Sequence, residues 1–163
     1  MPRAGWAKPW PLLVPALILA GCGGHAEAKY QTVSGSDFHF QAPAGWQVTR
    51  SGSTVSAASG TNLLRVQTFM LLKPYRHSLL KRAVKELDTD VDQLAADLKG
   101  KVVGRATLPI AGHDALMSTI AYGKLHQQIT FVLDGSREYE LICRNDGTAD
   151  EACAKLASTF TLD

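Results

Sequence analysis

Alternation of apolar and polar residues marks a series of strands along the chain. In residues 37–42, Phe38 and Phe40 point to one side and the polar residues to the other, which is the pattern of a half-buried strand. Similar patterns predict strands at residues 46–50, 54–57, 63–71, 102–110, 115–122, 125–133 and 137–144. Asp134-Gly135, between the last two, is a hairpin signal.

A helical period replaces this alternation in the middle of the chain. Apolar residues recur there at the spacing of one helix face, at Leu80, Val84, Leu87, Val91, Leu94 and Leu98. A single helix would be basic in its first half and acidic in its second, and both halves would oppose the helix macrodipole. We therefore predict two helices, residues 77–87 and 88–99, with a break at 88–90 and Gly100 as the C-cap.

A further helix is predicted near the end of the chain. Thr148 followed by Glu151 is a capping-box pattern, which predicts a helix over residues 149–158. Phe160 and Leu162 would then pack this end against the sheet. Strands, helices, an antiparallel meander and a final helix, in this order, indicate an α+β fold with an antiparallel sheet.

The first residues have the pattern of an export signal. Arg3 and Lys8 precede an apolar run at residues 12–20, which is too short to span a bilayer because about 20 residues are needed. Residues 19–22, Leu-Ala-Gly-Cys, resemble the bacterial lipobox, in which the cysteine, here Cys22, receives a diacylglycerol and a fatty acyl chain. The alternative is an ordinary secretory signal with an incidental cysteine.

Three segments follow from this pattern. We predict a signal peptide at residues 1–21, a lipidated flexible tether at 22–35, and one folded domain at 36–163. Acyl chains on Cys22 would hold an exported protein at a bacterial membrane, and we expect no other cofactor. Gly23 stands where inner-membrane retention signals often carry Asp, so a Gram-negative source would favour the outer membrane.

Composition and charge narrow the possible functions. The chain has 17 Lys+Arg, 15 Asp+Glu and 45% apolar residues, which argues against a nucleic-acid-binding protein and against a disordered tail. Arg3 and Lys8 would leave with the signal peptide, which holds no acid, so 15 basic residues would balance 15 acidic ones. The domain is long enough to fold alone, and we expect a monomer.

The other two cysteines, Cys143 and Cys153, lie ten residues apart. In an exported chain this favours a disulfide that ties the last helix to the sheet, with a stabilisation of roughly 3 kcal/mol from loop entropy. Two free buried thiols or a redox pair are the alternatives. The Cys-x-x-Cys spacing typical of a redox pair is absent from the sequence.

The sequence contains no recognisable catalytic motif. It lacks a Gly-x-Ser-x-Gly elbow, a glycine-rich phosphate loop and a His-Glu-x-x-His metal motif, so we predict neither an enzyme nor a metal site. His39 and His126 both lie on the polar side of their strands and could share a sheet face as a pH-sensitive or metal-binding pair. The alternative is two separate solvated histidines.

Two further features are candidates for a partner or ligand surface. Arg76, Lys81, Arg82 and Lys85 form a basic helical patch that could face anionic lipid or a partner, or could simply be solvated. Trp46 follows a turn, where it could plug the end of the sheet or stack on a ligand.

Several of these segments together resemble PsbP-like domains. Residues 37–46, DFHFQAPAGW, resemble the opening strand and Pro-x-Gly-Trp turn of that family. Residues 110–115, 139–141 and 158–160 resemble later parts, so the resemblance covers about residues 37–162. The superfamily includes an extrinsic subunit of photosystem II, a Ran-binding nuclear-import factor and many bacterial lipoproteins. It implies an α/β/α sandwich around a central antiparallel sheet, and binding or assembly more often than catalysis.

We therefore expect a lipid-anchored envelope protein that acts as a non-catalytic binding or assembly module. Its partner would be a protein, an envelope lipid or a glycan. A passive structural or stress-related lipoprotein is one alternative. A second is a small envelope hydrolase that uses Asp37, Asp114 or Asp134 with His39, His113 or His126.

Overall fold

A computed structural model describes residues 29–163, so the predicted signal peptide and Cys22 lie outside the described residues. The small sheet consists of β1 (Tyr30–Ser34), β2 (Phe38–Pro43) and β10 (Thr161–Leu162). The large sheet consists of β3 (Gln47–Ser51), β4 (Thr54–Ser59), β5 (Asn62–Met70), β6 (Lys101–Ile110), β7 (His113–Tyr122), β8 (Leu125–Asp134) and β9 (Arg137–Asn145). The helices are α1 (Leu80–Asp97), preceded by the 3-10 turn η1 (His77–Leu79), and α2 (Asp150–Thr159).

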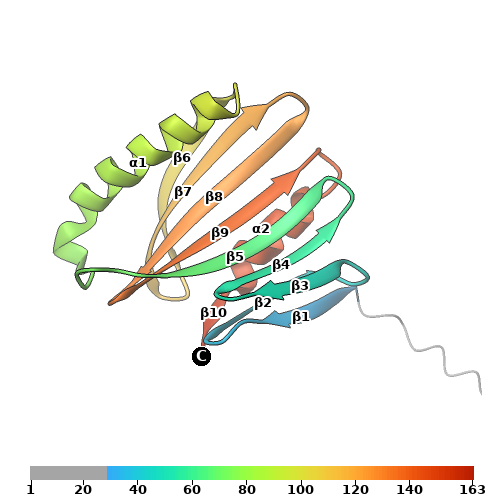
Figure 1. The fold of residues 1–163 in the computed structure, drawn as a ribbon, viewed down its shortest axis with the longest axis horizontal. Coiled ribbons are helices and arrows are strands. Elements are labelled where there is room, and N and C mark those ends of the chain that lie inside the picture. Colours follow the sequence, from blue (N-terminus) through green and yellow to red (C-terminus); the bar gives the residue numbers. More distant parts are fainter. Residues whose placement is uncertain (1–28) are drawn as a thin grey trace, which may run out of the picture.

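Both sheets are antiparallel (Figure 1). The strand order is β3-β4-β5-β9-β8-β7-β6 in the large sheet and β1-β2-β10 in the small one. Every predicted strand is present, and its ends differ from the prediction by at most two residues. The α+β class with an antiparallel sheet is therefore confirmed.

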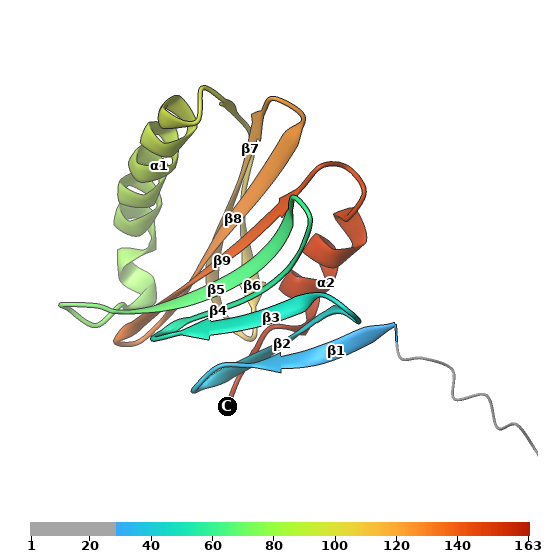
Figure 2. The same ribbon diagram turned by 45° about the vertical axis from the view of Figure 1, so that its right-hand side comes forward.

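The large sheet separates two unlike layers. α1 lies on one face, while α2 and the small sheet lie together on the other (Figures 1 and 2). The expected α/β/α sandwich fits only loosely, because strands dominate the chain and one outer layer is itself partly a sheet. Within residues 29–163, neither helix has the length and apolar character needed to cross a membrane.

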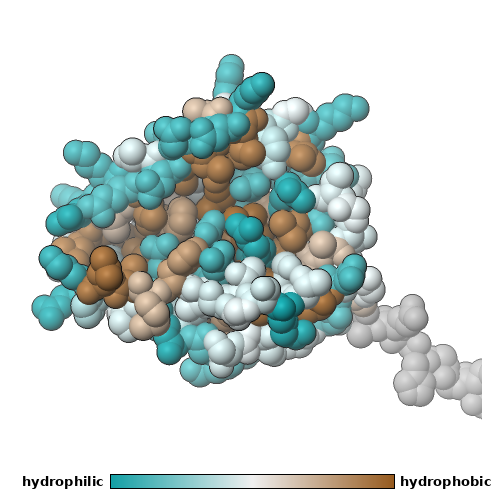
Figure 3. All heavy atoms as spheres, in the orientation of Figure 1, coloured by the Kyte–Doolittle hydropathy of each residue, from teal (hydrophilic) through white to brown (hydrophobic). Residues whose placement is uncertain are grey.

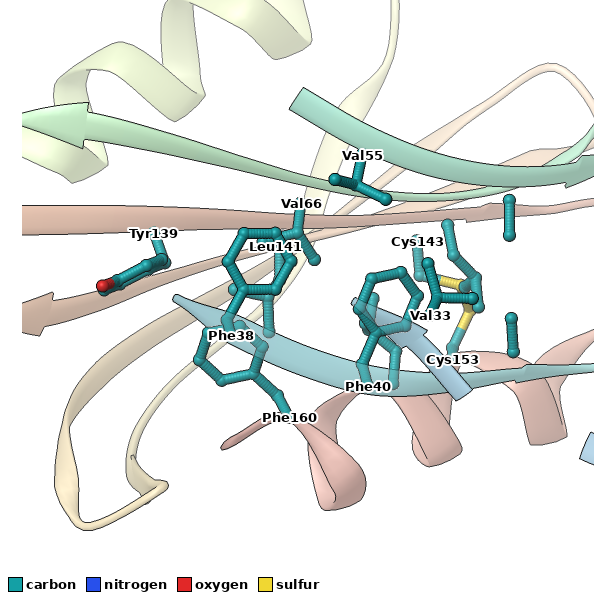
Figure 4. Packing of buried hydrophobic residues seen from close by; sticks show 14 of the residues in the cluster. Val33, Phe38, Phe40, Val55, Val66, Tyr139, Leu141, Cys143, Cys153 and Phe160 are labelled. Atoms are coloured by element: carbon teal, nitrogen blue, oxygen red, sulfur yellow. A yellow bond between two sulfur atoms is a disulfide. The ribbon is translucent and has the colours of Figure 1, made fainter. Parts of the chain in front are cut away.

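The main core lies between the large sheet and the layer of α2 and the small sheet. Its centre is a group of aromatic rings, Phe38, Phe40, Tyr139 and Phe160 (Figure 4). The ring centroid of Phe160 lies 5.8 Å from that of Phe38 and 5.7 Å from that of Tyr139, within the range of favourable aromatic contact. Burial of these rings joins both sheets and α2 in one core.

A disulfide joins Cys143 on β9 to Cys153 on α2, with a Cα–Cα distance of 5.4 Å (Figure 4). The predicted pairing is confirmed. It ties the last helix to the middle of the large sheet, as expected from the spacing.

The first strand corrects the predicted tether. Residues 30–34 were expected to be part of that tether, but they form β1, in which Val33 is completely buried opposite Phe40 of β2. The burial of one apolar side chain in a short polar stretch leaves little periodicity to detect. Lys29 Nζ and Tyr30 Oη also donate hydrogen bonds of 2.6 and 2.7 Å to Glu151 Oε1 of α2.

The predicted break at residues 88–90 is wrong, because α1 is one continuous helix. Arg105 of β6 lies 2.9 Å from Asp88 Oδ1 and 2.5 Å from Asp92 Oδ1. These ion pairs offset the unfavourable placement of acids in the second half of the helix, so the dipole argument does not require a break.

The C-terminal end of α1 and the N-terminal end of α2 are capped differently from the prediction. Lys99, not Gly100, adopts the left-handed conformation after α1, with φ 54°. Gly100 is needed for a close approach, because a Cβ there would lie 2.7 Å from the carbonyl oxygen of Ala121. The predicted capping box is also wrong, since Thr148 Oγ1 donates to Asp146 Oδ1 and Glu151 binds Lys29 and Tyr30.

β6 is an edge strand of the large sheet with two irregular features. Its register with β7 shifts between Val102 and Gly104, which leaves Val103 unpaired and 59% exposed. Pro109 lies near its end and has no N–H to donate.

Candidate binding groove

A groove opens between the first half of α1 and the large sheet. Its volume is about 660 Å³, and its other walls are the connection between β5 and η1, from Leu71 to Tyr75, and parts of β8 and β9. Leucines from several elements line it: Leu72, Leu79, Leu87 and Leu133. We call this site the α1 groove.

The α1 groove is open because α1 packs closely on the sheet only through its second half. Val91 and Ala95 are buried there against isoleucines of β7, β8 and β9. The apolar stripe continues into the first half of the helix, where its residues are half-buried and none is fully buried: Leu80, Val84 and Leu87.

Apolar side chains of the groove are unusually exposed. Leu72 is fully exposed, Met70 is 69% exposed and Leu79 is 42% exposed. Figure 3 shows hydrophobic side chains at the surface around α1 and the connection that leads to it from β5. Scattered single leucines need no explanation, but a cluster around a cavity is typical of a binding site.

Hydrogen bonds hold the connection that carries these side chains. The Leu71 and Tyr75 N–H groups donate to the carbonyl oxygens of Ser136 and Gly135, at 2.8 and 2.6 Å. Tyr75 Oη also donates to Asp114 Oδ2, at 2.5 Å. The segment that carries the exposed Leu72 is therefore fixed to the β8–β9 turn.

His77 completes this support, since its Nδ1 lies 2.7 Å from Asp114 Oδ2. The hydrogen bonds from Tyr75 and His77 hold the pKa of Asp114 below its usual value, because they favour the carboxylate. Burial and the hydrogen bond to this carboxylate raise the pKa of Tyr75. A charged Asp114 thus accepts from both residues at neutral pH.

The charges inside the groove are mainly negative where they are unpaired. Arg82 lines the groove, but its Nε lies 2.7 Å from Glu86 Oε1 and is engaged there. Glu138 of β9 and Asp90 of α1 have no ion-pair partner among residues 29–163. Burial, together with the nearby carboxylates of Glu140 and Asp90, raises the pKa of Glu138.

A second hollow, of about 570 Å³, lies between α2 and the strands β7 and β8. His126, Gln128 and Asp150 line it, next to the disulfide at Cys153. Its buried polar residue, Asn145, donates to Cys153 Sγ and accepts from the Gly147 N–H. These bonds fix the turn before α2, so they leave Asn145 little capacity for a ligand.

The two histidines singled out in the sequence do not meet. His39 lies on the small sheet, where its ring nitrogens are 2.7 Å from Asp163 Oδ1 and 2.7 Å from Thr161 Oγ1. His126 lies on the large sheet. The possible pair is therefore not formed, and the part of the chain described here holds no cluster of three or more His, Cys, Asp or Glu residues suited to a metal.

The other predicted surface residues lie in two places. Arg76, Lys81, Arg82 and Lys85 are all exposed around the start of α1, and Arg82 reaches the α1 groove. Trp46 is half-buried against the main core, and its carbonyl accepts from Gln31 Nε2 at 2.9 Å. That position matches the plug interpretation of Trp46.

Of the acids and histidines named in the hydrolase alternative, only Asp134 and His113 form an ion pair with each other. His113 Nδ1 lies 3.3 Å from Asp134 Oδ1, and His77 pairs with Asp114 beside the same shallow hollow of about 310 Å³. A His–Asp pair can orient a general base. The residues that line this hollow include no Ser, Thr or Cys to serve as a nucleophile.

Sequence reasoning missed the residues that define the α1 groove. One signal was present: the apolar run Met70-Leu71-Leu72 continues past the end of β5 toward Pro74, which places leucine where a polar turn is usual. No pattern in the sequence singled out Glu138, because it lies on the polar side of an ordinary alternating strand.

Comparisons with known proteins bear on the fold. No family model matches the sequence, and no curated protein matches it. The cyanobacterial PsbP protein (CyanoP) of Synechocystis sp. PCC 6803 has a similar structure, with a TM-score of 0.59 and 16% identity over 89% of this chain and 99% of that one. The chain has a PsbP-like fold. At this identity the likeness shows the fold alone.

Two further structures are similar to this PsbP-like chain. A Bacteroides thetaiotaomicron protein has a TM-score of 0.56 and 14% identity, over 83% of this chain and 48% of that one. LpqN, involved in cell envelope biogenesis of Mycobacterium tuberculosis, has a TM-score of 0.45 and 13% identity, over 82% of this chain and 90% of that one. The second likeness supports no conclusion about this chain.

Proposed function

We propose that the protein is a non-catalytic binding module of the bacterial cell envelope, held at a membrane by acyl chains on Cys22. The observation that carries the binding role is the α1 groove, in which exposed leucines are fixed by hydrogen bonds around a cavity of about 660 Å³. The lipobox pattern at residues 19–22 supports the anchor.

The position of β1 suggests which way the groove would face. β1 begins on the side of the domain opposite the start of α1 (Figures 1 and 2). Seven residues separate Cys22 from Tyr30, and a chain of that length spans at most about 29 Å. This is less than the diameter of the domain, about 35 Å, so an anchored domain would turn the groove away from its own membrane.

A protein is the partner that best fits this arrangement. A groove that faces away from the membrane meets other envelope proteins rather than the surrounding lipid. Its apolar walls, with Leu72 and Met70 exposed, suit apolar side chains better than a polar glycan. We therefore infer a partner protein, with lipid or glycan as outcomes of the test.

The test is photo-cross-linking in the source bacterium. A photo-reactive residue at position 72 should give one discrete protein adduct in the membrane fraction, while the same residue at Thr49, exposed on β3, should give none. Cys22→Ser should release the protein from that fraction. The proposal fails if positions 70, 72 and 79 give no adduct, or if the adduct is a lipid or a glycan.

A further inference from the structure

We propose that the α1 groove binds a short peptide segment of the partner that carries apolar side chains and a basic one. This inference rests on the proposed function and specifies the chemistry of the partner. It follows from the combination of an apolar wall and an unpaired acid on the floor of the groove.

The apolar side chains that line the groove are the reason to expect an apolar peptide. Leu72, Met70 and Leu79 project around one cavity from three different positions in the chain, and the connection that carries Leu72 is hydrogen-bonded to the β8–β9 turn. Ala83 and Leu87 of α1, both half-buried, line the same cavity. An amphipathic segment laid in such a groove would complete the packing that the sheet does not supply.

The basic requirement comes from Glu138. Its carboxylate is half-buried in the groove, and its neighbours across the sheet are Leu133 on β8 and Phe69 on β5. Burial, and the negative charges of Glu140 and of Asp90 on α1, raise the cost of leaving the Glu138 carboxylate unpaired. A Lys or Arg of the partner would supply the missing counter-charge.

The cations of the domain do not already meet this need. Arg82 is engaged by Glu86 at 2.7 Å. Lys73 also lines the groove, from the exposed connection, but no ion pair joins it to Glu138 within residues 29–163. Glu140, two residues along β9, differs because Arg65 lies 3.9 Å from it and because it does not line the groove. Two carboxylates of the groove, Glu138 and Asp90, are therefore unpaired against one ammonium, Lys73, so the balance of its unpaired charges is negative.

The same charges disfavour an anionic lipid. A phosphate headgroup with its chain among the leucines would approach Glu138 and Asp90, which are like-charged and close to the apolar wall. The basic residues Arg76, Lys81 and Lys85 are exposed around the start of α1 but do not line the groove. A peptide with one basic side chain matches both the walls and the floor.

The experiment measures peptide binding to the mature chain, residues 22–163 with Cys22→Ser, by fluorescence anisotropy. Three labelled peptides of about twelve residues serve as probes: Leu with Lys, Leu with Glu, and Ser with Lys. We expect only the Leu–Lys peptide to bind. Glu138→Gln should weaken that binding about tenfold, and Leu72→Ser should weaken it at least as much.

Two matched variants control for general effects. Glu140→Gln removes a neighbouring acid of the same strand, and Val103→Ser removes an exposed apolar side chain on β6; each should change affinity less than about twofold. Near-ultraviolet circular dichroism of each variant checks that it is folded.

Three results would overturn the inference. They are equal binding of the Leu–Glu and Leu–Lys peptides, equal effects of Glu138→Gln and Glu140→Gln, and displacement of the Leu–Lys peptide by phosphatidylglycerol vesicles in a Leu72-dependent manner. If no peptide binds while position 72 still cross-links to a protein in cells, this inference fails and the proposed function stands. If neither is seen, both fail.

Discussion

The two faces of the large sheet are covered in contrasting ways. On the α2 face, side chains from both sheets and α2 form one continuous core around Phe38, Tyr139 and Phe160, and a disulfide crosses it. On the α1 face, the buried cluster is small and lies under the second half of α1, with Val91 and Ala95 at its centre. The α1 groove opens beside this cluster, under the first half of the helix.

If the α1 groove is the binding site proposed above, stability and recognition belong to opposite faces of the sheet. A closed face that fixes the fold allows the other face to keep apolar side chains exposed without loss of the native structure. Matched substitutions on the two faces test this difference.

The aromatic core should dominate stability. Phe38→Ala removes a ring that is 1% exposed and packed on three other rings, so it should lower the free energy of unfolding by about 3–5 kcal/mol. Leu72→Ala, at a fully exposed position of the α1 groove, should change it by less than about 0.5 kcal/mol. Urea denaturation of both variants measures the difference, and similar losses would contradict the division of roles.

The disulfide should have the next largest effect. Replacing both Cys143 and Cys153 by Ala opens a closed loop of about eleven residues, which should lower the free energy of unfolding by about 3 kcal/mol on the loop-entropy argument. Denaturation of this variant is compared with that of the oxidised parent. The idea fails if reduction of the parent leaves its unfolding midpoint unchanged.

The ion pairs that hold α1 should contribute least. Arg105 is 38% exposed and bridges Asp88 and Asp92, so Arg105→Ala should lower the free energy of unfolding by no more than about 1 kcal/mol. The difference should shrink at roughly 1 M salt, where the Debye length is about 3 Å. Arg76→Ala, at an exposed position near the start of α1, is the control, and an equal loss there would remove the special role of Arg105.

Local patterns predicted most of the fold. Alternation placed every strand from β2 to β9, and the cysteine spacing gave the correct disulfide, because both depend on residues that lie close in sequence. β1 escaped detection because its single buried residue, Val33, shows no period. The two-helix prediction failed because Arg105, which belongs to another element, neutralises Asp88 and Asp92.

The α1 groove could not be predicted from the sequence because it results from incomplete packing between distant elements. The apolar stripe of α1 is regular from Leu80 to Leu98, so its periodicity does not reveal that only one half meets the sheet. Glu138 likewise becomes a distinctive group only when Asp90 and the apolar wall are brought beside it. Such a site depends on tertiary geometry rather than on a motif.

The irregular edge of β6 also has a consequence for how copies of the protein behave together. Molecules confined to a membrane surface, as proposed here, would collide often, and a long regular edge strand would invite strand exchange and polymerisation. The register shift at Val102–Gly104 twists that edge, and Pro109 removes one potential donor from it. In a membrane-anchored chain, the β6 edge would therefore be a poor template for strand pairing between crowded copies.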